Sequence, residues 1–247
     1  MTFAVLMVAA VVGIVAGTGY LAREQEPTRH FDTMPLSSSP NRIAVIGDSY
    51  TAGYEDTGRG AANWTERAWQ ILAGRGVYVS ADVAAEGGAG YGVRGNHGSL
   101  FGDLTRRVVR PDDALVLYFG SRNDQDVEPG QLSRLVADTL GLARRTAPGA
   151  RMLVIGPPWP TADVPGTVWR IRDILSAEAR AVGAAFVDPL AERWFVGLPE
   201  LIGPDGVHPT DAGHGSVSAH FHAVPRVAAL QIRHAGAPVV VDILKGV

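Results

Sequence analysis

Residues 42–53 read RIAVIGDSYTAG, and the predicted fold rests on this stretch. In its first half, residues 42–46, Arg42 is followed by four apolar residues, three of them β-branched, which is typical of a strand covered on both faces. Gly47 ends this run, so Ser49 lies at the carboxyl end of the predicted strand. If a helix begins there, its unpaired N–H groups and the positive end of its dipole would favour negative charge at Ser49. The alternative is that Ser49 only caps that helix.

Similar short apolar runs recur along the chain. They predict strands at residues 42–46, 77–83, 114–119, 152–155 and 184–187. Helical stripes of apolar residues lie between them, at about 64–72, 132–143 and 168–182. This alternation of strands and helices implies right-handed crossovers and a parallel sheet between two helix layers. In such α/β folds the reactive groups gather at the carboxyl ends of the strands, which is where Ser49 lies.

The N-terminus predicts contact with a membrane. No charged residue occurs from Phe3 to Ala22, and about 20 apolar residues at about 1.5 Å each span a bilayer core of about 30 Å. Residues 1–22 are therefore predicted to be a transmembrane anchor or a signal peptide. Small residues at 15–17 suit a cleavage site, whereas no basic residue precedes the apolar run, so both alternatives stay open. The protein is expected to be anchored at the cell envelope or secreted.

The remaining chain divides by composition. Residues 23–41 are polar, with three prolines and three consecutive serines, and predict a flexible linker. Residues 42–233 are predicted to form the folded domain. Residues 234–247 are a C-terminal tail, within which residues 239–244 could form a short extra strand or a packing segment.

Charge and cysteine content exclude several classes of function. The formal net charge of -3 lacks the basic excess of a nucleic-acid-binding protein, so no nucleic-acid partner is expected. The chain contains no cysteine. That excludes disulfides, thiolate metal sites and a thiol nucleophile.

Three further motifs carry candidate chemistry. Asp205 precedes His208 by three residues, on a turn interrupted by Gly206 and Pro209. In this arrangement the carboxylate can hold the ring's Nδ1 and leave Nε2 free to take a proton from a serine. Asn123 follows the third predicted strand and could donate its amide N–H to an oxyanion, although Asn is also common in turns.

A glycine-rich segment, residues 86–92 (EGGAGYG), follows the second predicted strand. It lets the backbone approach a reaction centre and could offer an N–H donor. A phosphate-binding loop is the rival interpretation, but neither a Gly-Lys-Ser/Thr ending nor the G-x-G-x-x-G spacing is present. His214, His220 and His222 follow on a predicted helix without the spacing of a metal site, so no metal is expected.

Taken together, GDSYTAG, GGAGYG, GSRND and DGVHPT resemble the four sequence blocks of the SGNH (GDSL-type) hydrolase family, in order, over residues 42–233. The resemblance implies a three-layer α/β/α sandwich with a flavodoxin-like, five-stranded parallel sheet. It implies Ser49 as the nucleophile, with Asp205 and His208 completing a triad. It also implies Gly90 and Asn123 as oxyanion donors, with Gly88 as the alternative to Gly90. At Ala85 or Glu86, relatives often carry Asn, which leaves the support of this loop open.

The expected activity is a serine esterase or acyl hydrolase that cleaves an acylated glycan or lipid through an acyl-enzyme, with no metal or organic cofactor. Two alternatives stay open. One is an acyltransferase that passes the same acyl group to an alcohol. The other is a catalytically idle, membrane-tethered module that binds a glycan.

Overall fold

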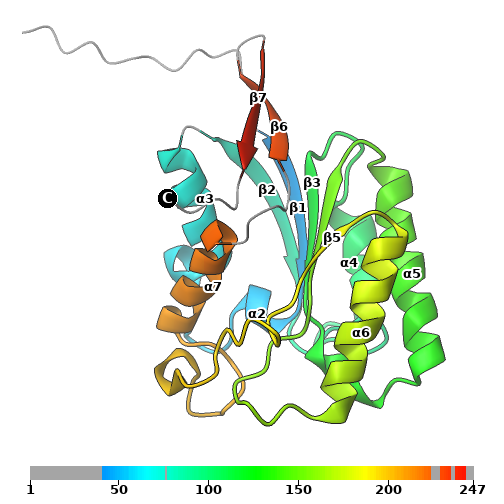
Figure 1. The fold of residues 1–247 in the computed structure, drawn as a ribbon, viewed down its shortest axis with the longest axis vertical. Helices are drawn as coiled ribbons and strands as arrows, with labels where there is room; N and C mark the ends of the chain where they lie inside the picture. The colour runs from blue at the N-terminus through cyan, green and yellow to red at the C-terminus, as the bar shows by residue number, and fades with distance from the viewer. Residues whose placement is uncertain (1–40, 76, 224–228, 235–236, 243–247) are drawn as a thin grey trace, which may run out of the picture. The chain divides into compact units, whose positions relative to one another are not determined.

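The computed structural model describes residues 41–75, 77–223, 229–234 and 237–242, and its centre is a five-stranded parallel sheet (Figure 1). The strand order is β2-β1-β3-β4-β5, the flavodoxin-like order. The strands are β1 (Asn41–Gly47), β2 (Val79–Ala85), β3 (Leu115–Phe119), β4 (Arg151–Ile155) and β5 (Ala185–Val187). This sheet confirms the predicted α/β fold class.

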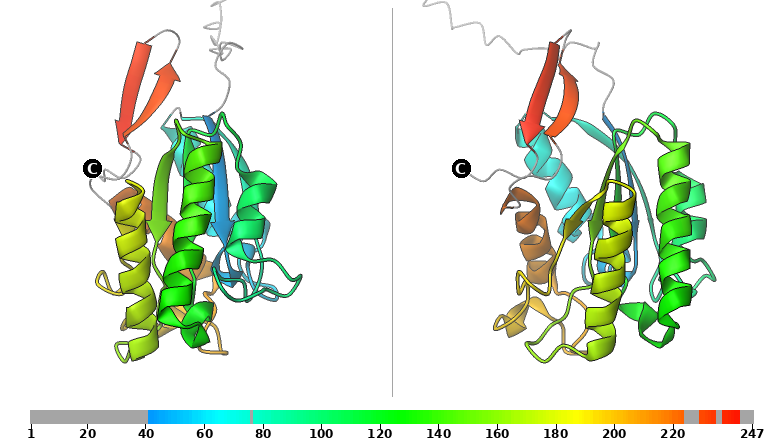
Figure 2. Two further views of the ribbon diagram at one scale, coloured as in Figure 1. Left: turned by 90° about the vertical axis from the view of Figure 1, so that its right-hand side faces the viewer. Right: turned by 45° about the vertical axis from the view of Figure 1, so that its right-hand side comes forward.

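Helices cover both faces of the sheet. The helices are α2 (Ser49–Ala52), α3 (Trp64–Gly74), α4 (Phe101–Val108), α5 (Pro129–Thr146), α6 (Gly166–Ala181) and α7 (Asp211–Ala223), with short 3-10 turns η1 (Gly60–Ala62), η2 (Arg122–Asp126) and η3 (Pro199–Leu201). Figure 1 shows α3 and α7 on one side of the sheet and α4, α5 and α6 on the other. Figure 2 shows the second group from its own side. The arrangement is the predicted three-layer sandwich.

The alternation of side chains along the central strands produces two hydrophobic cores. In β1, Ala44 and Ile46 pack with the α4, α5 and α6 side, whereas Ile43 and Val45 pack with Trp64 of α3 and its neighbours. All four β1 side chains are buried. Continuous apolar sequence in β1 therefore reflects a strand with a core on each face, as expected of a parallel sheet.

Two elements differ from the sequence prediction. β2 begins at Val79, two residues later than expected, because the N–H of Val77 donates to the carbonyl of Leu72 at 2.9 Å and closes the turn after α3. Helix α4 was not predicted. Its buried positions nevertheless follow helical spacing, at Phe101, Leu104, Thr105 and Val108, and the side chain of Asp103 accepts the N–H of Leu100 at its start.

The C-terminal region contains an antiparallel hairpin of β6 (Ala229–His234) and β7 (Ala237–Asp242). Residues 239–244 were expected to be a short strand or a packing segment, and most of them belong to β7. The hairpin crosses the predicted boundary between residues 233 and 234. The predicted membrane segment at 1–22 and the linker at 23–41 lie outside the described residues, apart from Asn41. Within the described part, none of the helices combines the length and apolar character needed to span a bilayer.

Candidate active site

Ser49 lies where β1 ends and α2 begins, at the carboxyl edge of the sheet. The helix is capped by Asp48, whose side chain accepts the N–H of Tyr50 at 2.9 Å. The capping alternative for Ser49 is therefore wrong, because its neighbour makes the cap. Gly47 is required just before this turn, since a Cβ there would lie 2.2 Å from Oγ1 of Thr51. Ser49 is thus held at the first turn of a helix with its hydroxyl available for another partner.

That partner is His208, which is 159 residues further along the chain. Nε2 of His208 lies 2.9 Å from Oγ of Ser49, and Nδ1 lies 2.6 Å from Oδ2 of Asp205. The structure thus brings these three predicted residues into one hydrogen-bonded chain. Burial acts to raise the pKa of Asp205, but hydrogen bonds from the His208 ring and from the N–H groups of His208 and Val207 outweigh it and lower the pKa to about 2. The carboxylate is therefore ionised at neutral pH and can stabilise a protonated imidazole.

Aromatic residues hold the histidine turn in place. The Tyr50 hydroxyl donates to the carbonyl of Val207 at 2.5 Å, next to His208. Tyr54 stacks on the imidazole, with ring centroids 3.8 Å apart and planes inclined by 8°. The sequence analysis did not identify Tyr54 as a site residue. No local pattern could have done so, because the contact joins residues 154 positions apart and depends on the folded path of the chain.

Asn123 lies in η2, after β3, and reaches the glycine-rich loop. Its Nδ2 donates to the carbonyl of Ala89 at 2.8 Å, which uses one of its two amide hydrogens. The N–H of Gly90 donates to the carbonyl of Val93 at 2.8 Å. Gly90 as an oxyanion donor therefore stays a prediction, and its N–H would have to leave or share that bond. The alternative donor, the N–H of Gly88, has no hydrogen-bond partner among the residues that the structure describes.

Asp124 joins these two loops. Its carboxylate accepts the N–H groups of Tyr91 at 2.9 Å, Gly92 at 2.8 Å and Val93 at 3.1 Å, and also the hydroxyl of Ser121. Asp124 is 1% exposed. Burial raises its pKa, and the four hydrogen bonds oppose that effect. This carboxylate therefore holds the loop after β2 against the turn that contains Asn123.

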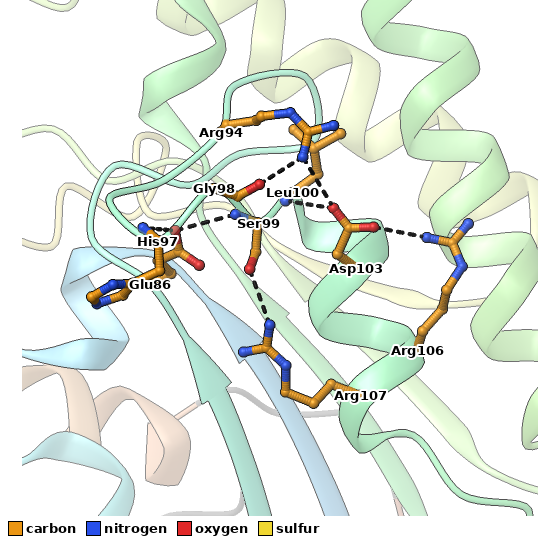
Figure 3. Close-up of polar contacts among 9 residues, drawn as sticks. All are labelled: Glu86, Arg94, His97, Gly98, Ser99, Leu100, Asp103, Arg106 and Arg107. Atoms are coloured by element: carbon orange, nitrogen blue, oxygen red, sulfur yellow. Dashed lines mark hydrogen bonds and ion pairs between the residues drawn. The ribbon is translucent and has the colours of Figure 1, made fainter.

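Glu86 supports the same loop from its other end (Figure 3). Its carboxylate accepts the N–H of His97 and, at 3.2 Å, the N–H of Ser99. Burial acts to raise the pKa of Glu86, but these hydrogen bonds outweigh it and the pKa is lowered. Relatives often carry Asn at this position. In this chain the buried Glu86 supports the loop instead, because its carboxylate binds the backbone of residues 97 and 99.

A third buried carboxyl group, Asp48, directly precedes the proposed nucleophile in the chain. Its Oδ2 has no hydrogen-bond partner in the described part of the chain, and burial raises its pKa to about 7. The positive charge of Arg122 opposes this shift. The Arg122 guanidinium in turn lies 4.1 Å from the centroid of the Trp159 ring, a cation–π contact. Asp48 therefore caps α2 at a considerable cost in desolvation.

A cavity of about 670 Å³ opens beside Ser49. Its walls come from the loop after α2 and from the glycine-rich loop, and its lining includes Tyr54, Asn63, Glu86 and His97. Across the described residues, no group of three or more His, Cys, Asp or Glu side chains is arranged to hold a metal ion. What the arrangement offers chemically is a serine hydroxyl, an imidazole base in contact with it and a space next to the serine.

Comparisons with known proteins identify the family of the chain. Residues 45–215 match the model of the GDSL-like lipase/acylhydrolase family. The GDSL lipase Rv0518 of Mycobacterium tuberculosis (strain ATCC 25618 / H37Rv) is 57% identical over 207 residues, which cover 83% of this chain and 90% of that protein. Among solved structures, TesA superposes with a TM-score of 0.60 at 22% identity, over 72% of this chain and 94% of that one.

A family two carbohydrate esterase from Clostridium thermocellum, solved with cellohexaose, superposes with a TM-score of 0.57 at 17% identity, over 73% of this chain and 62% of that one. At such low sequence identities, the two structures show a shared fold and nothing more. The sandwich and the family match together define a hydrolase that acts on carboxylic esters. The chain belongs to the GDSL-like lipase/acylhydrolase family, as the resemblance to SGNH hydrolases implied.

Proposed function

We propose that the protein is a serine esterase that cleaves an acylated glycan or lipid through a covalent acyl-enzyme, with Ser49, His208 and Asp205 as its triad. The observation that carries this proposal is the continuous contact from Asp205 Oδ2 to His208 Nδ1 at 2.6 Å and from His208 Nε2 to Ser49 Oγ at 2.9 Å. A serine hydroxyl is a poor nucleophile unless a base takes its proton, and this arrangement supplies an oriented base.

In the first step, Nε2 of His208 accepts the Ser49 proton while Oγ attacks the ester carbonyl. The oxyanion that forms accepts hydrogen bonds from the N–H of Ser49, at the first turn of α2, and from the second amide hydrogen of Asn123. His208 then gives its proton to the leaving alcohol, and the C–O bond breaks. In the second step His208 takes a proton from water, and the hydroxide oxygen attacks the acyl carbonyl. The bond between the acyl carbon and Ser49 Oγ then breaks, His208 returns the proton to Oγ, and the acid is released. Each oxyanion donor contributes about 3 kcal/mol to lowering the barrier.

The test uses the full chain and p-nitrophenyl acetate. Ser49→Ala should lower kcat by about 10⁴-fold or more, because the nucleophile is lost. Ser80→Ala is the matched control, since Ser80 is an exposed serine on β2. A fluorophosphonate probe should label the wild type on Ser49 and leave Ser49→Ala unlabelled. Equal activity in Ser49→Ala and wild type would contradict the proposed nucleophile.

We also propose that the enzyme acts at the cell envelope or outside the cell, through the apolar segment at residues 1–22. The absence of charge from Phe3 to Ala22 supports this. Fractionation of cells that express the full chain provides the test. An anchored protein stays in the membrane pellet after carbonate extraction, and an exported one loses residues 1–22, which N-terminal sequencing detects. Recovery of an intact N-terminus in the soluble cytosolic fraction would contradict the proposal.

A further inference from the structure

The cavity beside Ser49 indicates which part of the ester the enzyme recognises. Its volume of about 670 Å³ falls within the range of about 300–1,000 Å³ that is typical of small-molecule sites. One wall is the loop from Gly53 to Gly60, and the other is formed by the end of β2 together with Glu86, Gly87, Asn96 and His97. Ser49 belongs to the lining, so a ligand bound in this cavity lies next to the proposed nucleophile.

The lining is polar and carries charge. Glu55, Arg59, Glu66 and His97 are exposed side chains that line it. Two carboxylates and a single guanidinium leave this rim with a net negative charge when His97 is neutral. The buried Asn63 and Thr65 also belong to the lining, and they hydrogen-bond to each other, which makes that part of the wall rigid.

Little in this lining suits a long hydrocarbon chain. Among the described lining residues, Val83 is the one large aliphatic side chain. An acyl chain gains about 0.8 kcal/mol for each CH₂ group that it buries against apolar surface, and carboxylates and amides offer no such surface. The negative rim also disfavours anionic ligands such as phosphorylated head groups.

A neutral, hydroxylated ligand fits these walls better. Carboxylates such as Glu55 and Glu66 accept hydrogen bonds from hydroxyl groups, and hydrogen bonds to an ionised acceptor are stronger than those between neutral groups. Tyr54 also lines the cavity, is 39% exposed and stacks on His208. Its ring offers an apolar surface to the C–H face of a sugar, directly beside the proposed base.

We propose that this cavity binds the sugar part of an acylated saccharide, so that a neutral glycan ester, rather than a lipid ester or an anionic ester, is the substrate. The inference rests on the proposed function, because it takes Ser49 as the nucleophile. It selects one of the two substrate classes, glycan and lipid, that the triad alone leaves open. The glycan's hydroxyl groups contact the Glu55 and Glu66 carboxylates while its ester carbonyl lies against Ser49.

The test compares acetyl esters that differ only in their alcohol part, with the full chain as the enzyme. The substrates are 6-O-acetyl cellobiose, octyl acetate and p-nitrophenyl acetate. We expect kcat/KM for the sugar ester to exceed that for octyl acetate by about tenfold or more, the effect of one or two well-placed hydrogen bonds. Glu55→Gln and Glu66→Gln should raise KM for the sugar ester by about threefold to tenfold and change its kcat little.

Asp138→Asn is the matched control, because Asp138 is an exposed carboxylate on α5, outside the cavity lining. It should leave all three substrates unaffected. A higher kcat/KM for octyl acetate than for the sugar ester would overturn the glycan inference. So would a sugar-ester KM that is the same in wild type and in both glutamate variants. In either case, Ser49-dependent hydrolysis of p-nitrophenyl acetate would still support the esterase. If the hydrolysis of p-nitrophenyl acetate does not depend on Ser49, the proposed function itself is overturned.

Discussion

Replacing Asp124 by Asn tests whether one buried carboxylate positions the loops around Ser49. In the wild type, Oδ1 accepts two backbone N–H groups, from Gly92 and Val93, and Oδ2 accepts the N–H of Tyr91 and the hydroxyl of Ser121. An Asn side chain has one oxygen, so an NH₂ group must replace the other one. At least one buried N–H then faces a donor in place of an acceptor.

The size of the effect follows from these contacts. An unsatisfied buried N–H costs about 1–3 kcal/mol, and two charge-assisted hydrogen bonds that become neutral lose about 1 kcal/mol each. Removing a buried charge recovers part of its desolvation cost. The net expectation for Asp124→Asn is a decrease of about 3 kcal/mol in the free energy of unfolding. Misplacement of the glycine-rich loop and Asn123 by about 1 Å should also lower kcat about 100-fold.

The assay is urea unfolding of the full chain at pH 8, followed by tryptophan fluorescence, together with kcat for p-nitrophenyl acetate. Asp126→Asn is the control, because Asp126 is exposed in the same turn, η2. It should change the free energy of unfolding by less than about 0.5 kcal/mol. If Asp124→Asn unfolds at the same urea concentration as wild type and keeps its kcat, the loop is held by other contacts and the reasoning is refuted.

Three further variants test other contacts. Burial raises the pKa of Asp48 from its ordinary 3.8 to about 7, so between these pH values the folded protein keeps a proton that the unfolded chain has lost. The free energy of unfolding should therefore fall by up to about 4 kcal/mol as the pH rises from 4 to 7. Urea unfolding of Asp48→Asn across this range should lack that decrease. Gly58→Ala should destabilise by more than about 2 kcal/mol in thermal or urea unfolding, because φ is +63° and a Cβ would lie 2.0 Å from Nε2 of the buried His214. Tyr54→Leu should lower kcat/KM about fivefold, since the aromatic ring that stacks on His208 and holds its orientation is lost.

Controls for these variants come from the same chain. Gly183→Ala has a similar φ of +67° but no atom within 4 Å of the added Cβ, so it should cost less than Gly58→Ala. Tyr54→Phe keeps the stacked ring and should retain most of the activity. An unchanged pH slope in Asp48→Asn would contradict the burial argument, and equal costs for the two glycine variants would contradict the predicted steric clash. An unchanged kcat/KM in Tyr54→Leu would contradict a role for the stacked ring.

The features that could be predicted from the sequence are those that depend on residues close together in the chain. Residues 42–46 lie in a strand because residues 43–46 are continuously apolar and mostly β-branched, and Ser49 follows at its carboxyl end. Asp205 and His208 are three residues apart, so their contact is made within one turn. Even the unpredicted α4 has helical spacing in its buried residues, but it is short and contains Gly102 and three charged side chains, which conceal that spacing in the sequence.

What the sequence by itself determined is therefore the order of the elements, the sheet edge at which the reactive residues lie and the chemical identity of those residues. Only the tertiary structure decided that Glu86 supports the loop where Asn was expected, that the Gly90 N–H is bonded to Val93, and that Tyr54 covers His208. It also decided the polar character of the cavity. The physical reason is distance along the chain. Periodicity and turn preferences report interactions over a few residues, whereas a loop's hydrogen bonds and a cavity's walls depend on which distant segments the packed sheet brings together.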